Sequence, residues 1–288
     1  MLLPYLRQQI AKGQSHVPVT AEARDVLRKL YRGEIRLGSG KREPISEIAT
    51  PPKGISAEST QNTAPLAEHI PRPQPQGSSP AERWESLKEL TGHWPSFKSL
   101  NSFRKTLVFG SGSLAANLVM VGATPTGTDE RSGQPFSGET GKKLDQILKA
   151  MGLKREEVYL TNLCKFRPAL PGQTTNNRPP RAQEIAYSLP FFEAELEIVR
   201  PTMIVALGAT AAQGLLGFEN TKPDLTALRG SWHDFQGYPL RISHHPSFLL
   251  LDDKDAGQEK RKIWEDMLVT MEKLSLPISD KQRGYFTK

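Results

Sequence analysis

"NLVMVG" (117–122) is a continuous apolar run that ends in glycine, and the fold predicted for the chain is built around it. The segment "GKKLDQILKAMGL" (141–153) follows it and places Leu144 and Leu148 on one face of a helix. "EVYLTN" (157–162) is the next strand-like run, which completes a strand–helix–strand unit. Continuous apolar strands of this kind are typical of a parallel sheet that is covered on both faces.

The same alternation continues along the chain. Two more apolar runs, "TMIVALG" (202–208) and "YPLRIS" (238–243), predict strands, and helices are expected over 180–200 and 209–217. We therefore predict an α/β fold, a three-layer α/β/α sandwich around a four-stranded, mostly parallel sheet. Ligands of such sheets bind beyond the carboxyl ends of the strands, so the segments that follow the strands are the candidates for a site.

The chain before this region has a different composition. Residues 1–34 predict an N-terminal helical segment, with a helix over about Thr20 to Arg32. Residues 35–80 are rich in proline, serine and other polar residues, and we expect a disordered linker there. The main domain is then expected over 81–288, starting with a helix near Pro80.

Composition limits the kinds of partner and cofactor. The 288 residues include 38 Lys and Arg against 31 Asp and Glu, a net charge of +7 that suits a partner carrying phosphates. The single cysteine, Cys164, excludes a disulfide framework within one chain and a metal site of several thiolates, and no cofactor is expected. No apolar run approaches the ~20 residues of a membrane span, so we predict a cytoplasmic protein that makes no membrane contact.

Several residues at the predicted strand ends have chemistry suited to a nucleobase. Phe136 follows a glycine–proline turn and can stack on a flat ligand. Asn162 ends a strand and offers an acceptor and two donors. His245, held in an extended or turn conformation by the proline after it, can donate to an oxygen on which negative charge develops. Each of these residues, taken alone, is also compatible with a purely structural role.

The surrounding loops carry groups that suit DNA. The apolar tip Phe248–Leu250 can wedge into a base stack. Basic residues that can hold phosphates stand in the same loops: Arg131, Lys165, Arg167, Arg178 and Arg181.

Five segments, taken together, resemble a known family in order and spacing. They are "VGATPTGTDERSGQPFSGETGKKLDQIL", "VYLTNLCKFRP", "RPTMIVALGATAAQGLLG", "LRGSW" and "HHPSFLL". They resemble the uracil-DNA glycosylase superfamily, and the closest pattern is its family-four, iron–sulfur branch. The match covers about residues 105–251 and leaves out the first hundred residues.

The resemblance implies a uracil base flipped out of DNA and assigns roles to single residues. Phe136 matches the residue that stacks on uracil, Asn162 the one that reads its edge, and His245 the one that supports the departing base. The substrate-binding segment is expected to include Gly122, Ala123, Thr124 and Pro125, and DNA contacts are expected from Lys165, Arg167, Arg178, Ser247 and Phe248.

The sequence also departs from the family-four pattern. Phe166 and Ser188 stand where two of the four cluster cysteines are expected, and "HWPSFKSL" (93–100) has no cysteine for the other pair. Ala123 and Thr124 occupy the place of the usual motif-one carboxylate. The remaining candidates for catalytic carboxylates are Asp129 and Glu130.

We therefore expect a monomeric, cluster-free hydrolase that excises uracil from DNA in base-excision repair. It is expected to be slow, because a positioned base adds about 10²–10⁴-fold to such a rate. Two alternatives stay open at this point. One is a catalytically degenerate protein that binds nucleic acid without excising the base, which Ala123 and Thr124 favour. The other is an unrelated α/β enzyme that acts on a small molecule.

Overall fold

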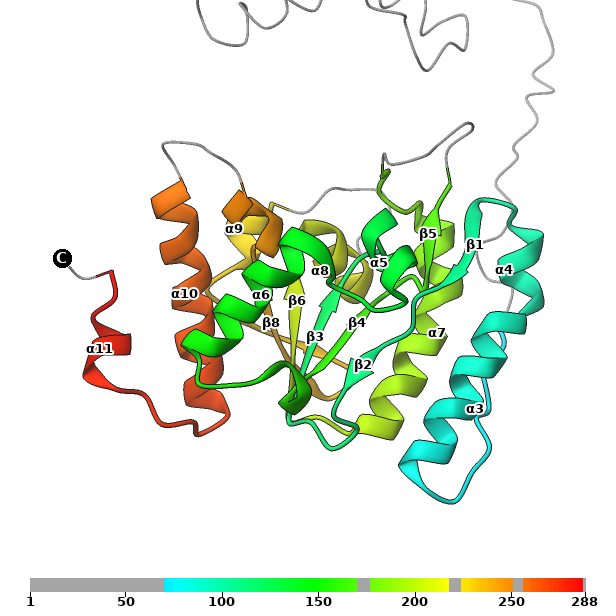
Figure 1. Ribbon diagram of the computed structural model, residues 1–288, viewed down its shortest axis with the longest axis horizontal. Helices are drawn as coiled ribbons and strands as arrows, with labels where there is room; N and C mark the ends of the chain where they lie inside the picture. The colour runs from blue at the N-terminus through cyan, green and yellow to red at the C-terminus, as the bar shows by residue number, and fades with distance from the viewer. Residues whose placement is uncertain (1–69, 170–176, 218–223, 251–255, 287–288) are drawn as a thin grey trace, which may run out of the picture. The chain divides into compact units, whose positions relative to one another are not determined.

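The computed structural model describes residues 70–169, 177–217, 224–250 and 256–286 (Figure 1). The predicted N-terminal helical segment (1–34) and residues 35–69 of the predicted linker lie outside the described residues. The described chain is a mixed α/β domain built on one six-stranded sheet, with a small two-stranded sheet beside it.

The main sheet has the order β2-β4-β3-β6-β8-β7. Its four inner strands are parallel, and they coincide with the four predicted strands, so the prediction of a mostly parallel α/β sheet is confirmed. The strands of the sheet are β2 (Ser111–Gly112), β3 (Leu118–Gly122), β4 (Tyr159–Asn162), β6 (Met203–Leu207), β7 (Trp232–Phe235) and β8 (Tyr238–Ser243).

The predicted strand number was too low, because an antiparallel strand is added at each edge. β2 is only two residues long and is too short to leave an alternating pattern. β7 forms a hairpin with β8 through Gln236 and Gly237, whose φ angles are 52° and 87°. A two-residue turn with positive φ at both positions usually carries Asn-Gly or Asp-Gly. Because glutamine is the first residue here, the sequence pattern does not indicate this hairpin.

Helices pack on both faces of the sheet because successive strand side chains point to opposite sides. Met120, Leu160 and Val205 pack with α6 (Gly138–Ala150) and α10 (Ala256–Lys273). Val119, Val121 and Ile204 pack with α7 (Ala182–Val199) and α8 (Ala209–Leu216). The remaining helices are α3 (Pro80–His93), α4 (Pro95–Ser99), α5 (Gly127–Ser132), α9 (Leu225–Leu228), α11 (Asp280–Arg283) and the 3-10 turns η1 (Arg155–Glu157) and η2 (Pro246–Leu250). Among the residues described, no helix has the length and apolar character needed to cross a membrane.

The described end of the predicted linker, residues 70–80, differs from the expectation. Arg72 pairs with Glu193 at 2.5 Å and with Glu197 at 3.1 Å, both on α7. The Gln76 amide donates to Ser86 Oγ at 2.9 Å, and Ser79 caps α3 in a capping box. Residues of the domain therefore hold this proline-rich stretch through ion pairs and hydrogen bonds. Its composition alone does not predict these contacts.

A cluster of aromatic side chains joins α3, α4 and α7 to the two-stranded sheet of β1 (Phe103–Leu107) and β5 (Phe166–Pro168). Figure 1 shows α3, in cyan, beside α7 at the far side of the domain from α10. We call Trp94, Phe97, Phe103, Phe166 and Phe191 the aromatic cluster. Phe97 lies at its centre, with its ring centroid 5.0 Å from Phe191 and 5.3 Å from Phe166.

The aromatic cluster is expected to contribute strongly to stability. Phe97→Ala removes a buried ring and leaves a cavity, so the free energy of unfolding should fall by about 3–5 kcal/mol. Phe97→Leu keeps much of the buried apolar volume and should cost clearly less. Urea unfolding followed by circular dichroism measures both variants. Equal, small losses would mean that the cluster is loosely packed.

Candidate active site

The carboxyl ends of the parallel strands meet at one edge of the sheet. The ladder pairs Gly122 of β3 with Asn162 of β4, and Leu207 of β6 with Ser243 of β8. A cavity of about 350 Å³ lies beyond these strand ends. This is the position at which open parallel sheets bind ligands.

The cavity brings together most of the residues that the sequence singled out. The predicted residues that line it are Ala123, Thr124, Asp129, Phe136, Asn162, His245, Ser247 and Phe248. Sequence reasoning did not single out the other lining residues, which are Thr126, Ser137, Thr140, Leu207, Gly208, Ala209 and Thr210. Apart from Leu207, which ends β6, their only signal is their position in the segments that follow β3 and β6, the segments in which the sequence analysis expected a site.

Gly122 shapes the cavity without lining it. A Cβ atom at this position would lie 2.4 Å from Asn162 Oδ1 and 2.8 Å from Phe136 Cζ. The lack of a side chain therefore allows the Phe136 ring and the Asn162 amide to approach the strand end from two sides. Pro125, predicted with Gly122 to bind substrate, is buried and is not among the lining residues.

His245 is held in one tautomer by Ser247. The Ser247 backbone N–H donates to His245 Nδ1 at 3.3 Å, and Ser247 Oγ lies 2.8 Å from the same nitrogen. Since Nδ1 accepts, Nε2 carries the proton of the neutral ring. Burial lowers the pKa of His245 to about 4, although the Asp129 carboxylate partly opposes this shift. The ring is therefore neutral at pH 7 and remains a hydrogen-bond donor.

Asp129 is the one carboxylate among the lining residues of this cavity. Its Oδ2 accepts from the Thr126 N–H at 2.7 Å and from the Thr126 hydroxyl at 2.8 Å, as part of the capping box of α5. Its Oδ1 accepts from the Ser137 N–H at 2.6 Å. The side chain thus holds two loop segments together at the cavity wall.

Glu130, the second predicted catalytic carboxylate, points elsewhere. It is not among the lining residues, and it pairs with Arg167 at 2.9 Å and with Arg104 at 3.6 Å. In the described conformation its charge is balanced by two guanidinium groups outside the cavity.

Three basic residues predicted to contact DNA are engaged inside the domain. Lys165 is fully buried and donates to Glu195, to the Thr161 hydroxyl and to the Asn162 carbonyl. Arg167 is 1% exposed and pairs with Glu130. Arg178 forms a two-pronged pair with Glu184 at 2.5 and 2.7 Å. In the described conformation each of them has a carboxylate partner within the domain, and their predicted contact with DNA stays a prediction.

The rim of the cavity is formed by η2. Phe248 lines the cavity and is 37% exposed. Its ring lies edge-on to His244, with the centroids 5.2 Å apart. His244 faces α10, where its Nδ1 lies 2.8 Å from Glu259 Oε2, and it is not among the lining residues. The two adjacent histidines therefore have different surroundings.

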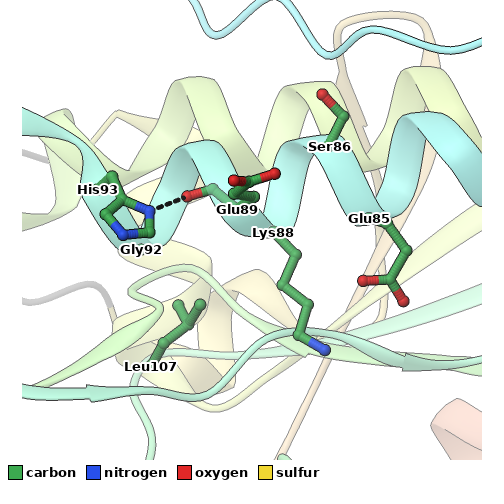
Figure 2. A pocket seen from close by; sticks show the side chains of 7 residues that line it. All are labelled: Glu85, Ser86, Lys88, Glu89, Gly92, His93 and Leu107. Carbon is green, nitrogen blue, oxygen red and sulfur yellow. Dashed lines mark hydrogen bonds between the residues drawn. The ribbon is translucent and has the colours of Figure 1, made fainter.

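A second cavity, of about 480 Å³, lies between α3 and β1 (Figure 2). Apart from Leu107, every residue that lines it comes from α3. His93 Nδ1 lies 3.0 Å from the Glu89 carbonyl oxygen. Figure 2 shows the ring turned back toward that carbonyl. The residues that line this cavity include none from the strand ends of the main sheet. The cavity at the strand ends is therefore the candidate active site.

The fold and the site define a class: an α/β protein with a cavity at the carboxyl ends of its parallel strands, lined by both polar and apolar side chains. The family model of the uracil DNA glycosylase superfamily matches residues 109–268, more than half of the chain. This chain belongs to that superfamily.

Three relatives of this chain carry the name Type-4 uracil-DNA glycosylase. The chain is 37% identical to the Type-4 uracil-DNA glycosylase of Thermotoga maritima over 161 residues, which are 56% of this chain and 78% of the relative. It is 37% identical to the Type-4 uracil-DNA glycosylase of Sulfurisphaera tokodaii over 64% of this chain and 81% of the relative. The Archaeoglobus fulgidus protein of the same name is 31% identical over 58% and 84%.

The residues present do not fit the iron–sulfur cluster of the family-four branch. A cluster needs about four thiolates, and the sequence has one cysteine. Burial raises the pKa of the Cys164 thiol to about 12, so the thiolate form is disfavoured. Phe166 and Ser188 stand at two expected cysteine positions; the first belongs to the aromatic cluster and the second donates to the Glu184 carbonyl. No group of three metal-binding side chains occurs in the described parts of the chain.

We expect the purified protein to carry no iron. Aerobically purified full-length protein should have no iron or acid-labile sulfide in stoichiometric amount, and no visible absorbance from a cluster. Incubation with a chelator should leave its melting temperature unchanged. Iron and sulfide at a fixed ratio to protein would contradict this, because only one thiol is present in each chain.

The buried His245 ring should titrate far below an ordinary histidine. Its pKa is about 4, because burial disfavours the charged ring. Raising the pH from 5.5 to 8 should therefore leave it neutral, as followed by NMR of the labelled imidazole ring. The Asp129 charge favours protonation, so Asp129→Asn should lower the pKa further. A midpoint near 6.5 in the parent would mean that the ring is solvated.

Proposed function

We propose that this chain is a uracil-DNA glycosylase, which binds uracil flipped out of DNA and hydrolyses the bond between uracil and deoxyribose in base-excision repair. The observation that carries the proposal is the meeting of Phe136, Asn162 and the neutral His245 around one cavity. The relatives named Type-4 uracil-DNA glycosylase support it. The family's three-layer α/β/α arrangement belongs to the same proposal, supported by helices on both faces of the sheet.

Recognition of the base uses groups on two sides of the cavity. The Phe136 ring offers a face on which a pyrimidine stacks. The Asn162 amide offers both an acceptor and a donor, which match the N–H and the carbonyl on the edge of uracil. Asn162 is 4% exposed, so these hydrogen bonds form away from bulk water, where they are stronger.

His245 acts on the departing base. As the C1′–N1 bond breaks, its electron pair moves onto the uracil ring and its carbonyl oxygens. The Nε2–H of the neutral imidazole donates to such an oxygen, and the donor is fixed in place before the reaction starts. Water then forms a bond to C1′ and releases one proton, and the uracil anion takes up one proton, so the products are an abasic deoxyribose and neutral uracil.

Asp129 takes the place of the missing motif-one carboxylate as the charged group of the cavity. Its negative charge stabilises the positive charge that develops on the sugar. Both of its oxygens already accept hydrogen bonds from loop groups, so the carboxylate is less available to accept a proton from water. We therefore propose a slower enzyme than one with a free carboxylate at Ala123 or Thr124, where a base would add about 10²–10⁴-fold.

The DNA duplex would meet the rim of the cavity. Phe248 on η2 and its exposed neighbour Leu250 suit the role of a wedge that fills the gap left by the flipped base. Of the basic residues expected to hold phosphates, Arg131 and Arg181 are exposed. A cytoplasmic location and a monomeric state remain predictions.

The second candidate function is a protein that binds uracil or DNA without cleaving the bond. Ala123 and Thr124 favour it, because neither side chain can activate water as a base. A labelled, uracil-containing oligonucleotide separates the two candidates. The proposal expects abasic sites, revealed as alkali-labile breaks, and none in the matching thymine oligonucleotide. Tight binding without breaks would support the second candidate.

His245→Ala should nearly abolish uracil release. The hydrogen bond from Nε2 strengthens only as the bond breaks, so its loss should cost about 10²–10³-fold in the single-turnover rate, or ~3–4 kcal/mol. Affinity for uracil-containing DNA should stay near that of the parent. Rapid-quench kinetics and binding titrations measure the two effects separately.

His244→Ala is the matched control. His244 faces Glu259 and Phe248 outside the lining of the cavity, so its loss should change the single-turnover rate far less. Equal rates for His245→Ala and the parent would show that His245 is structural.

A further inference from the structure

The peptide group that joins Phe136 to Ser137 is held at both ends by opposite charges. On one side, Arg155 Nη2 donates to the Phe136 carbonyl at 2.9 Å. On the other, Asp129 Oδ1 accepts from the Ser137 N–H at 2.6 Å. The carbonyl and the N–H belong to the same planar unit, so the two side chains together fix its orientation.

Phe136 needs such a restraint. Its φ angle is 53°, in the left-handed region that residues with a Cβ atom rarely adopt. A backbone in that region persists only where its surroundings hold it. The same conformation directs the ring at Gly122, where it lies beside Asn162 Oδ1. The strained turn and the proposed stacking surface are therefore one feature.

Arg155 is well placed to hold this turn from outside the cavity. It lies in η1, between α6 and β4, and is not among the residues that line the cavity. Its Nη2 also donates to the Pro135 carbonyl at 2.5 Å, so one guanidinium group donates hydrogen bonds to two successive carbonyls. Its Nη1 pairs with Asp145 of α6 at 2.9 Å.

The N-terminal part of α6 leaves room for the Phe136 carbonyl. A Cβ atom at Gly141 would lie 1.8 Å from the Phe136 oxygen, so only glycine leaves room for it. The carbonyl thus lies between the helix backbone and the guanidinium. This close fit, together with the two hydrogen bonds, restricts the movement of the Phe136–Ser137 peptide group.

We propose that Arg155 is a positioning residue for base recognition, which acts through the Phe136–Ser137 peptide to hold the Phe136 ring as a stacking surface for uracil. The inference rests on the proposed function and adds a determinant that does not touch substrate. Arg155 fits this role better than lysine would, because its planar fork reaches both carbonyls and Asp145 at once.

Kinetics on the full chain test the role. Arg155→Ala should lower kcat/KM on uracil-containing DNA by roughly 10- to 100-fold, since a shift of the ring misplaces the base against His245. Arg155→Lys, with a single ammonium group, should recover part of the loss. Asp145→Asn is the matched control: it removes the outer ion pair, leaves the carbonyl bonds, and should change kcat/KM by less than about twofold.

A double-mutant cycle with Phe136→Ala separates positioning from general stability. If Arg155 acts through the ring, then Arg155→Ala should cost less than about twofold once the ring is gone. The same fold-loss in both backgrounds would overturn the proposal. So would a loss in Asp145→Asn equal to that in Arg155→Ala.

Hydrogen exchange keeps the test independent of the proposed function. Arg155→Ala should speed exchange of the Ser137 amide by about tenfold or more, and Asp145→Asn should not. NMR measures this on the protein alone, with amides of the sheet as an internal reference for global stability. If the parent releases no uracil, the proposed function fails, while hydrogen exchange still shows whether Arg155 holds the Phe136–Ser137 peptide in place. Unchanged Ser137 protection in Arg155→Ala would overturn the positioning role.

Discussion

The site depends on the absence of a side chain at Gly122. This residue ends β3 and pairs in register with Asn162, which ends β4. The Phe136 ring and the Asn162 amide both occupy space that a Cβ atom would take. Parallel pairing brings the two strand ends to the same level, and the bare backbone lets an aromatic face and an amide edge meet there. The remaining parts of the site, His245 between β8 and η2 and Asp129 from α5, are arranged around this contact.

The sequence predicted the strands of the framework but did not reveal the internal partners of its charged residues, for physical reasons. Apolar runs such as "LVMVG" and "MIVAL" identify strands because both of their faces are buried. The position of a charged side chain depends on partners that are distant in sequence. Lys165 is buried because Glu195 on α7 faces it, and Arg167 is buried because Glu130 does. A local pattern of basic residues after a strand cannot distinguish a phosphate contact from an internal ion pair.

The same limit explains the two predicted carboxylates. Asp129 and Glu130 are adjacent in sequence, but α5 turns one into the cavity wall and the other toward two arginines. Their separation follows from the capping box with Thr126, which fixes the first turn of the helix. Asp129 is then committed to backbone hydrogen bonds, including the Ser137 N–H on which the Phe136 turn depends. Asp129 thus places a carboxylate in the cavity lining and also holds the adjoining loops by hydrogen bonds, so a substitution there alters both the charge of the cavity and the fold of the loops.

The aromatic cluster has a consequence for how the protein is made. In this chain, rings from α4, β1, β5 and α7 fill the region where the resemblance expects cysteine ligands. Those rings are part of the polypeptide, so this region closes as soon as the chain is synthesised and collapses. Its maturation draws nothing from cellular iron and sulfur delivery. Oxidants that dismantle iron–sulfur centres find no such target in it, and such oxidants also damage DNA. A chain built in this way has no cluster in this region whose loss would open the packed rings.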